Sequence, residues 1–256
     1  MSTQFGDTAK DKATASFARS VISIKDLVGK KSELSLGRQA LAIGRGLVFA
    51  DTDYNDGVLL KNTIGKFNVT SYFITEAAEI DVAGINIDYS PNQKYIFSSG
   101  HFTVEKNPTL MQKSTFNDIG FSAELQKGIT IIGQYVRADL TNHPDAYAVQ
   151  LAYNWKSGKR QKMFYGWEKA VDPLVAHDQA ISAAYINVDR QALPGYGNGL
   201  FKGYGTITND NYKGYTVSYQ NMVEKNIHTY ITYSSLKQKV GANHDNKLVA
   251  GLEFFY

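Results

Sequence analysis

The stretch Ala146-Tyr-Ala-Val-Gln-Leu-Ala-Tyr-Asn-Trp155 decides the fold class, because its side chains alternate between two chemical kinds. Five large side chains share one face: Tyr147, Val149, Leu151, Tyr153 and Trp155. The residues between them are small or polar: Ala146, Ala148, Gln150, Ala152 and Asn154. Side chains of a β-strand point alternately to opposite faces, so this period of two predicts a strand that separates two different environments.

The same alternation recurs along the chain in segments of about 9 to 13 residues, a length suited to tilted strands that cross a bilayer. Helical periodicity is scarce by comparison. The pattern predicts about thirteen strands, near residues 16–26, 32–41, 56–64, 66–76, 80–90, 93–104, 114–126, 129–140, 146–156, 161–170, 212–224, 227–238 and 247–256.

Short turns alternate with longer polar connections between these segments. The short turns contain Gly65, Pro91-Asn92, Lys127-Gly128, 157–159 and 224–226, and the longer connections span 42–55, 105–113, 171–211 and 239–246. A soluble β-sandwich also uses hairpins, but its strands are usually shorter. We therefore predict an all-β fold: an antiparallel up-and-down transmembrane β-barrel of about 14–16 strands, with short periplasmic turns and long extracellular loops.

Composition excludes several classes of function. The 256 residues carry 27 Lys and Arg against 24 Asp and Glu, a net charge of +3, which provides no broad basic surface for nucleic acid. No apolar run approaches about 18 residues, so transmembrane helices are excluded. The 17 Tyr outnumber the 13 Phe, which suits aromatic rings at a boundary between hydrocarbon and water. The absence of Cys excludes disulfides and thiolate metal sites.

The N-terminus shows no secretory signal, because Met1-Ser-Thr-Gln4 leads into polar sequence without an apolar core. The chain is then either cytosolic or a mature chain with an added start codon. The barrel pattern favours the second interpretation.

The two faces of the predicted strands have different roles in a barrel. A barrel of about 14 to 16 strands is too wide for side chains to fill, so the polar face would line a wet lumen. The lumen-lining candidates are Gln150, Asn154, Thr216, Gln220, Thr232 and Glu253. The apolar face would meet lipid, with rings at the strand ends forming aromatic girdles: Tyr147, Trp155, Tyr165, Trp167, Tyr215, Tyr219, Tyr233, Phe254 and Tyr256.

The C-terminal stretch Leu248-Val-Ala-Gly-Leu-Glu-Phe-Phe-Tyr256 ends on an aromatic residue preceded by apolar residues at alternate positions. It resembles the terminal strand of bacterial outer-membrane barrels, and the alternative is an ordinary amphipathic edge strand. Glu33-Leu-Ser-Leu-Gly-Arg-Gln39 and Asp51-Thr-Asp-Tyr-Asn-Asp-Gly-Val58 are similar to the "LGRQ … DGV" stretch of many bacterial porins. Lys213-Gly-Tyr215 followed by Glu224-Lys-Asn226 is similar to their last hairpin.

This resemblance implies an integral protein of the bacterial outer membrane, in contact with its lipid and assembled as a homotrimer, with a monomer as the alternative. It extends to porins whose barrel follows an S-layer-homology anchor, although no anchor domain is present here. Residues 1–256 are predicted to form one barrel domain. Barrels with both termini in the periplasm have an even strand number, and thirteen is odd. Either residues 180–189 form a further strand, or N-terminal strands precede this chain.

Charged residues near the start of the chain are candidates for a pore constriction. Arginines on one wall opposite carboxylates would create a transverse field that sets ion preference, from Arg19, Arg38, Arg45, Asp51, Asp53 and Asp56. The alternative is a solvated loop with local salt bridges, which contribute little to stability. Strict alternation places Arg38 on the lipid face, so it must snorkel, end a strand or follow a bulge.

Other site chemistry finds little support. The five His residues are scattered without an i,i+4 pair, which disfavours a metal site. Ser98, Ser99 and His101 lie close in sequence, but adjacent strand residues face opposite ways and no Gly-x-Ser-x-Gly elbow is present. The Gly/Tyr-rich stretches 195–199 and 203–205 lack the Lys-Ser/Thr of a phosphate loop. We expect no catalytic residue and no cofactor.

The function that this pattern favours is an outer-membrane porin, a water-filled channel for passive diffusion of small hydrophilic solutes and ions. The long connection 171–211 would then fold into the lumen, cover its mouth, or form an extracellular loop. A barrel enzyme or adhesin that acts through its extracellular loops is the second hypothesis. A soluble lipid-binding all-β protein is the third.

Overall fold

A computed structural model describes residues 2–3, 15–16, 20–76, 80–105, 113–165, 168–193 and 211–255. Thirteen strands form one sheet in this part of the chain: β3 (Ser20–Lys25), β4 (Ser32–Ile43), β5 (Phe49–Ile64), β6 (Phe67–Glu76), β7 (Ile80–Asn92), β8 (Tyr95–Val104), β9 (Ser114–Gln126), β10 (Ile129–Ala138), β11 (Asp145–Asn154), β12 (Gln179–Val188), β13 (Tyr212–Glu224), β14 (Ile227–Gln238) and β15 (His244–Phe254). Two short strands, β1 (Ser2–Thr3) and β2 (Ala15–Ser16), pair separately. Over the described ranges, no helix is long and apolar enough to span a membrane.

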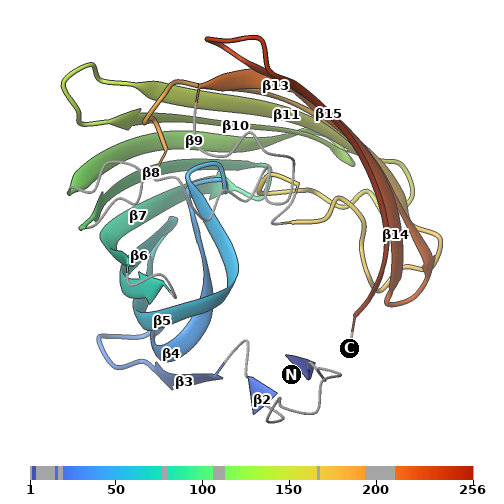
Figure 1. Cartoon of the computed structure of the whole chain (residues 1–256). Helices are drawn as coiled ribbons and strands as arrows, with labels where there is room; N and C mark the ends of the chain where they lie inside the picture. Colours follow the sequence, from blue (N-terminus) through green and yellow to red (C-terminus); the bar gives the residue numbers. More distant parts are fainter. Residues whose placement is uncertain are drawn as a thin grey trace, which may run out of the picture.

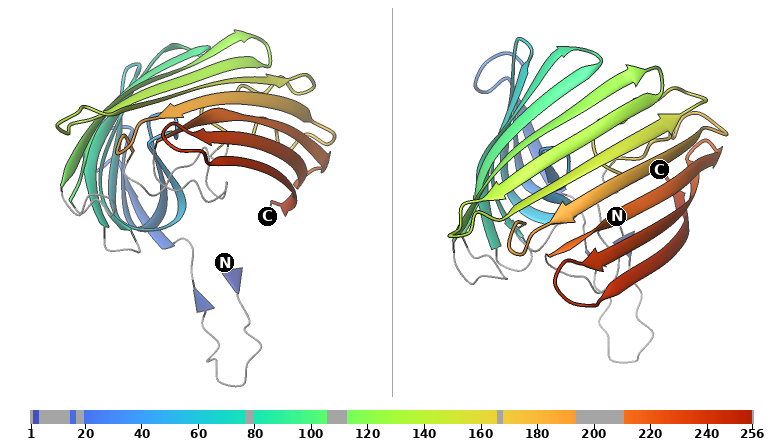
Figure 2. Two further views of the ribbon diagram at one scale, coloured as in Figure 1. Left: turned by 45° about the horizontal axis from the view of Figure 1, so that its top comes forward. Right: turned by 90° about the horizontal axis from the view of Figure 1, so that it is seen from above.

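The sheet is antiparallel and up-and-down throughout, because every strand pairs only with its neighbours in sequence. This confirms the predicted fold class. The strands tilt and the sheet curves around an interior, as Figure 1 and the two views of Figure 2 show. The described part of β3 and of β15 each pairs with one strand, so the barrel is not closed there. With thirteen alternating strands, β3 and β15 run in the same direction.

One predicted strand and one predicted loop are corrected by the structure. Residues 161–170, expected as a strand, form none in their described part, because the backbone N–H groups of Lys162 and Met163 donate to the Glu168 carboxylate instead of a strand ladder. The alternative strand near 180–189 is present as β12. The long polar loop expected at 42–55 is largely strand, and only a tight turn at 44–48 separates β4 from β5.

The outer face of the sheet exposes the large apolar side chains, as the alternation predicts. Leu151 is 50% exposed, whereas the adjacent Gln150 on the inner face is 1% exposed. Outer rings pair across strands, with centroids 6.2 Å apart for Tyr215–Tyr233 and 6.3 Å apart for Trp155–Tyr219. Exposed rings of this kind are what a lipid-facing surface carries.

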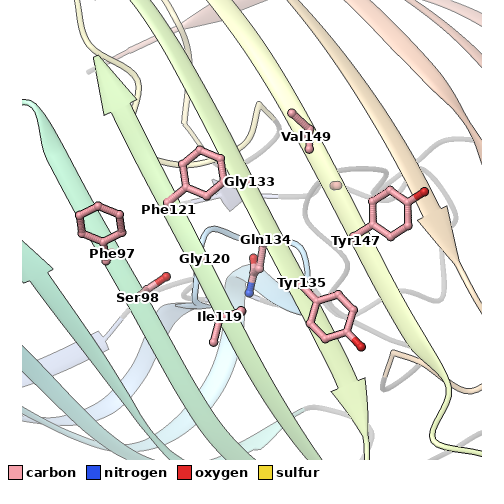
Figure 3. A pocket seen from close by; sticks show the side chains of 11 residues that line it. Phe97, Ser98, Ile119, Gly120, Phe121, Gly133, Gln134, Tyr135, Tyr147 and Val149 are labelled. Carbon is pink, nitrogen blue, oxygen red and sulfur yellow. The ribbon is translucent and has the colours of Figure 1, made fainter. Parts of the chain in front are cut away.

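A hollow of about 440 Å³ lies in this outer face (Figure 3), and the ring of Phe121 covers Gly133 at its floor. Its lining is apolar, and the rings around it are Phe97, Phe121, Tyr135 and Tyr147. Because it opens on the face that carries the exposed rings, it lies outside any path through the barrel.

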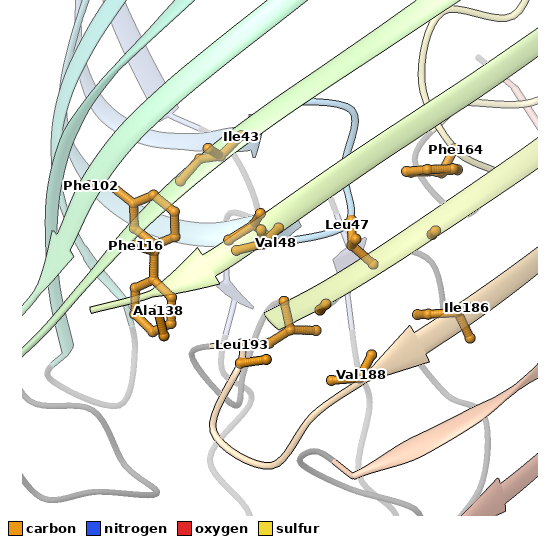
Figure 4. Close-up of a cluster of buried hydrophobic side chains, with 14 of the residues drawn as sticks. Ile43, Leu47, Val48, Phe102, Phe116, Ala138, Phe164, Ile186, Val188 and Leu193 are labelled. Atoms are coloured by element: carbon orange, nitrogen blue, oxygen red, sulfur yellow. The ribbon is translucent and has the colours of Figure 1, made fainter. Parts of the chain in front are cut away.

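The inner face is divided into two zones. Toward the ends of β8–β14 where the β8–β9, β10–β11, β12–β13 and β14–β15 connections lie, buried apolar side chains form one cluster with the β4–β5 turn (Figure 4). Its members include Phe102, Phe116, Val136, Ile186, Val188 and Leu236. Toward the opposite ends, the inner face is mostly polar, with a smaller apolar cluster that includes Ala152, Ala180 and Met222. The sequence pattern did not indicate the apolar zone, because inner positions were predicted to be polar along the whole strand.

Candidate functional site

The β4–β5 turn, residues 44–48 and hereafter the tip, bends into the interior and docks on the opposite wall. Gln134 Oε1 on β10 accepts hydrogen bonds from the backbone N–H of Arg45 at 2.9 Å and of Leu47 at 3.0 Å. Asn86 Oδ1 on β7 accepts one from Gly44 at 3.3 Å. The turn requires glycine at Gly44 and Gly46, whose φ angles of 61° and 95° are left-handed.

Arg45 fixes the tip further through its side chain, which is almost fully buried. Its Nη2 lies 2.6 Å from Asp88 Oδ1, and its Nη1 donates to the Lys162 carbonyl at 3.3 Å. The stem of Arg45 crosses the wall above Gly120, where a Cβ atom would lie 3.0 Å from Arg45 Cγ. The small residue on β9 therefore makes room for the arginine.

A second part of the chain fills the interior between β11 and β12: residues 155–178, hereafter the inner segment, described at 155–165 and 168–178. Carboxamides on the wall accept hydrogen bonds from its backbone. Gln150 Oε1 accepts from Tyr165 N–H at 2.9 Å, and Gln220 Oε1 from Ala170 N–H at 3.0 Å. The inner segment also meets the tip, because Phe164 N–H donates to the Arg45 carbonyl at 3.0 Å.

Asp178 holds the two ends of the inner segment together. Its carboxylate accepts from the backbone N–H groups of Ser157 at 2.9 Å and Asp172 at 2.6 Å, and from Asn154 Nδ2 at 2.7 Å. Burial by itself raises the pKa of a carboxyl group. Here the hydrogen bonds from the Asp172 and Ser157 backbones, and from the Asn154 and Ser157 side chains, hold the pKa of Asp178 below its usual value.

Lys159 serves the same segment from within. Its Nζ donates to the carbonyls of Lys169 at 2.7 Å and Val171 at 3.0 Å. Burial lowers the pKa of this ammonium group, because a cation loses hydration inside the protein. Lys159 therefore stabilises the inner segment and does not supply an exposed charge to the interior.

The structure places the lumen-lining candidates on the inner face, but mostly beneath other parts of the chain. Gln150, Asn154, Thr216, Gln220 and Thr232 are at most 4% exposed. Glu253 is the exception, because its side chain is 39% exposed and its Oε2 lies 2.8 Å from Lys169 Nζ. The same oxygen lies 3.0 Å from Nδ1 of the buried His228. Three of these side chains hold the inner segment by hydrogen bonds: Gln150 to Tyr165, and Asn154 and Gln220 to Ala170.

The constriction candidates do not form one cluster. Arg38 and Asp56 pair on the outer face at 2.7 Å, where alternation had placed Arg38. Arg45 lies inside, bound to Asp88 rather than to the predicted carboxylates. Arg19 and the side chains of Asp51 and Asp53 lie outside the described residues.

Sequence reasoning missed Asp88, Asp118 and Gln134 as the partners of the tip. Asp118 is 2% exposed, and its Oδ1 accepts from Gln134 Nε2 at 3.0 Å. A Cβ atom at the neighbouring Gly100 would lie 2.1 Å from Asp118 Oδ2, so this glycine gives the carboxylate its space. The sequence signal that could have indicated this buried carboxylate is a charged residue, Asp118, at an inner position of a predicted strand, with a glycine at the facing position of the neighbouring strand.

The girdle candidates divide in a similar way. Six rings are exposed on the outer face by 38% to 53%: Tyr147, Trp155, Tyr215, Tyr219, Tyr233 and Phe254. Tyr165 is 8% exposed and lies inside against Ser218 and Thr232, so its assignment to a girdle is wrong. The inner segment carries it there in place of a strand. Trp167 and Tyr256 lie outside the described residues.

Charged side chains remain accessible on parts of the inner wall. Lys61 on β5 is exposed and lies opposite the half-buried Glu33 on β4. The Asp88 side chain is 26% exposed and that of Lys169 is 32% exposed. Over the described ranges, no group of three or more His, Asp or Glu side chains is arranged to hold a metal ion.

Comparisons with known proteins identify the fold. No family model and no curated protein matches the chain. Among solved structures it resembles three from Pseudomonas aeruginosa. OccK11 (OpdR) has a TM-score of 0.53 and 12% sequence identity, and the match covers 88% of this chain and 66% of that chain. For OccK10 (OpdN) the TM-score is 0.54, the identity 10%, and the coverage 88% of this chain and 69% of that chain. For OpdL the TM-score is 0.50, the identity 14%, and the coverage 86% of this chain and 66% of that chain. The chain thus spans about two thirds of the length of these proteins. Its fold is that of the outer-membrane porin β-barrels.

Proposed function

We propose that this chain forms a channel of the bacterial outer membrane for the passive diffusion of small hydrophilic solutes and ions. The observation that carries the proposal is the contrast between the two faces of the sheet. Rings and aliphatic side chains are exposed outside, while Lys61, Asp88 and Glu253 keep charge accessible inside. A sheet in hydrocarbon must pair its backbone internally and presents this distribution when it surrounds water.

The tip and the inner segment narrow the channel. The backbone N–H groups of both donate hydrogen bonds to buried carboxamide oxygens on the wall, so they are fixed obstacles rather than loose loops. The charges accessible beside them, at Asp88 and at the Lys169–Glu253 pair, bias which ions pass. Size exclusion and fixed charge are sufficient for this function, which needs no catalytic group or cofactor.

The protein would lie in the outer membrane as a single barrel domain over residues 1–256, in contact with lipid. A homotrimer is the assembly that we propose. The likeness to porin folds supports these assignments, and chemical cross-linking in the membrane would test the trimer directly.

Conductance of the purified protein in a planar bilayer tests the proposed function. We expect discrete openings whose current is proportional to voltage. Lys61→Glu reverses an exposed charge on the inner face, so the reversal potential in a salt gradient should shift in the direction of higher cation selectivity. Lys225→Glu, in the exposed turn between β13 and β14, should leave the reversal potential unchanged. A folded, membrane-inserted protein that never conducts would refute the channel function and favour an enzyme or adhesin that acts through its loops.

A further inference from the structure

Two lysines face each other across neighbouring strands on the outer face, at the strand ends where the β12–β13 and β14–β15 connections lie. Lys213 on β13 lies directly opposite Lys237 on β14, and Lys237 lies opposite His244 on β15. All three residues are exposed. Side chains directly opposite in an antiparallel pair have Cβ atoms about 4.5 to 5.5 Å apart, and like charges there are destabilising.

Elsewhere on the same face, opposite charges occupy such positions. Arg38 lies opposite Asp56 with a 2.7 Å ion pair, and Arg137 lies opposite Asp145. Neither Lys213 nor Lys237 makes an ion pair with a described residue. The nearby Asp189 is already paired with Lys239. The two ammonium groups therefore form a positive site without a carboxylate from the described chain.

The surface below this site is apolar and aromatic. Tyr215 follows Lys213 by two residues on the outer face and is 48% exposed, and Tyr233 is 39% exposed with its ring centroid 6.2 Å away. Val217, Ile231 and Leu248 continue the apolar surface along the strands. Such an arrangement places cations at the level of lipid headgroups, aromatic rings at the interface, and aliphatic side chains beside acyl chains.

We propose that Lys213 and Lys237, with His244 at their side, bind the anionic phosphate headgroup of a lipid whose acyl chains lie along Tyr215, Tyr233 and Leu248. The phosphate supplies a negative charge that no described residue provides to the two opposed lysines. The aromatic rings below favour a ligand that also carries hydrocarbon chains. His244 is held in place by Ser235, whose Oγ lies 2.9 Å from His244 Nε2. This inference rests on the proposed location in a membrane.

Native mass spectrometry of the whole chain in uncharged detergent tests the site with defined lipids. Phosphatidic acid should be retained in preference to phosphatidylcholine with the same acyl chains. The double variant Lys213→Gln/Lys237→Gln should lose about tenfold in retention of phosphatidic acid. Lys213→Arg/Lys237→Arg should keep it. The control Lys225→Gln removes a lysine from the turn at the far end of the same hairpin and should behave as the parent protein.

Thermal unfolding in the same detergent separates lipid binding from damage to the fold. Without lipid, the double Gln variant should unfold at the same temperature as the parent or higher, because like-charge repulsion is relieved. Phosphatidic acid should raise the unfolding temperature of the parent protein and leave that of the variant unchanged. Equal retention of both lipids by the parent protein would overturn the proposal. An equal rise in unfolding temperature for the parent and the double Gln variant on adding phosphatidic acid would also overturn it. Full displacement of phosphatidic acid by millimolar inorganic phosphate would also overturn it, because the lipid chain would then be irrelevant.

Conductance of the double Gln variant distinguishes this inference from the proposed function. Both lysines point away from the interior, so single-channel conductance should be unchanged. Lipid selectivity in a protein that never conducts would refute the channel and retain the lipid site. A protein that conducts but shows no lipid selectivity would retain the channel and refute the lipid site.

Discussion

The guanidinium of Arg45 lies 2.6 Å from the carboxylate of Asp88, and this ion pair ties the turn between β4 and β5 to the wall formed by β7. The arginine is buried and the aspartate is partly exposed to the interior, so the pair lies at the edge of the accessible space. The tip therefore depends on one charged contact in addition to its backbone hydrogen bonds to Gln134 and Asn86.

Replacing Arg45 by Met should release the tip. The side chain keeps its apolar stem but loses the contacts with Asp88 and the Lys162 carbonyl, and we expect a loss of about 1 to 3 kcal/mol in the free energy of unfolding. Single-channel conductance should rise as the constriction widens. Arg38→Met is the matched control, because it breaks an exposed outer pair worth at most about 1 kcal/mol. Equal effects of the two variants on conductance would contradict a role for the tip.

Gly44→Ala should be much more harmful than Gly65→Ala. Both glycines have left-handed φ angles, 61° and 60°, so both variants carry a similar backbone strain of about 1 kcal/mol. A Cβ atom at Gly44 would lie 2.0 Å from Gln134 Nε2 and 2.5 Å from Asp118 Oδ1, whereas nothing lies within 4 Å at Gly65. Urea unfolding in detergent compares the two losses. Similar midpoints would mean that the tip is not docked against Gln134.

Asp178→Asn should loosen the inner segment, because the neutral amide offers fewer acceptors to Ser157, Asp172 and Asn154. Hydrogen bonds to a charged group contribute about 1.5 to 3 kcal/mol. The pKa of Asp178 is lower in the folded protein, so the unfolded state binds more protons at acidic pH. Its stabilising contribution is complete above the unfolded pKa of about 3.9 and is lost as pH falls below it.

Unfolding free energies measured from pH 7 down to pH 3 check this linkage. The parent protein should lose more stability than Asp178→Asn over the lower part of the range, so the two curves should converge. Asp172→Asn is the control, because Asp172 contributes its backbone N–H rather than its carboxylate to the same cluster. Parallel curves for the parent and Asp178→Asn would show that this carboxylate is not the acid-sensitive group.

The local pattern was sufficient to predict strands and their faces, and insufficient to predict what fills the interior. Leu151 and Gln150 face opposite sides because alternation is a local property of a strand. The hydrogen bond from Arg45 N–H to Gln134 joins residues 89 apart in sequence, which no local pattern encodes. The strand expected at 161–170 fails for a related reason: Glu168 and Gln150 accept its backbone N–H groups, and only the folded barrel brings Gln150 near.

Two positions on one strand test whether the outer face meets lipid and the inner face meets water. Val58 is 39% exposed on the outer face of β5, and Lys61 is exposed on the inner face three residues later. The chain contains no Cys, so Val58→Cys and Lys61→Cys each introduce a single thiol. In lipid vesicles a charged, water-soluble maleimide should label Lys61→Cys quickly and Val58→Cys slowly, because the hydrocarbon of the bilayer excludes a charged reagent. In denaturant the two thiols should react at similar rates, which controls for intrinsic reactivity. Faster labelling at Val58→Cys in vesicles would show that the sheet turns its apolar face to water and would refute the channel.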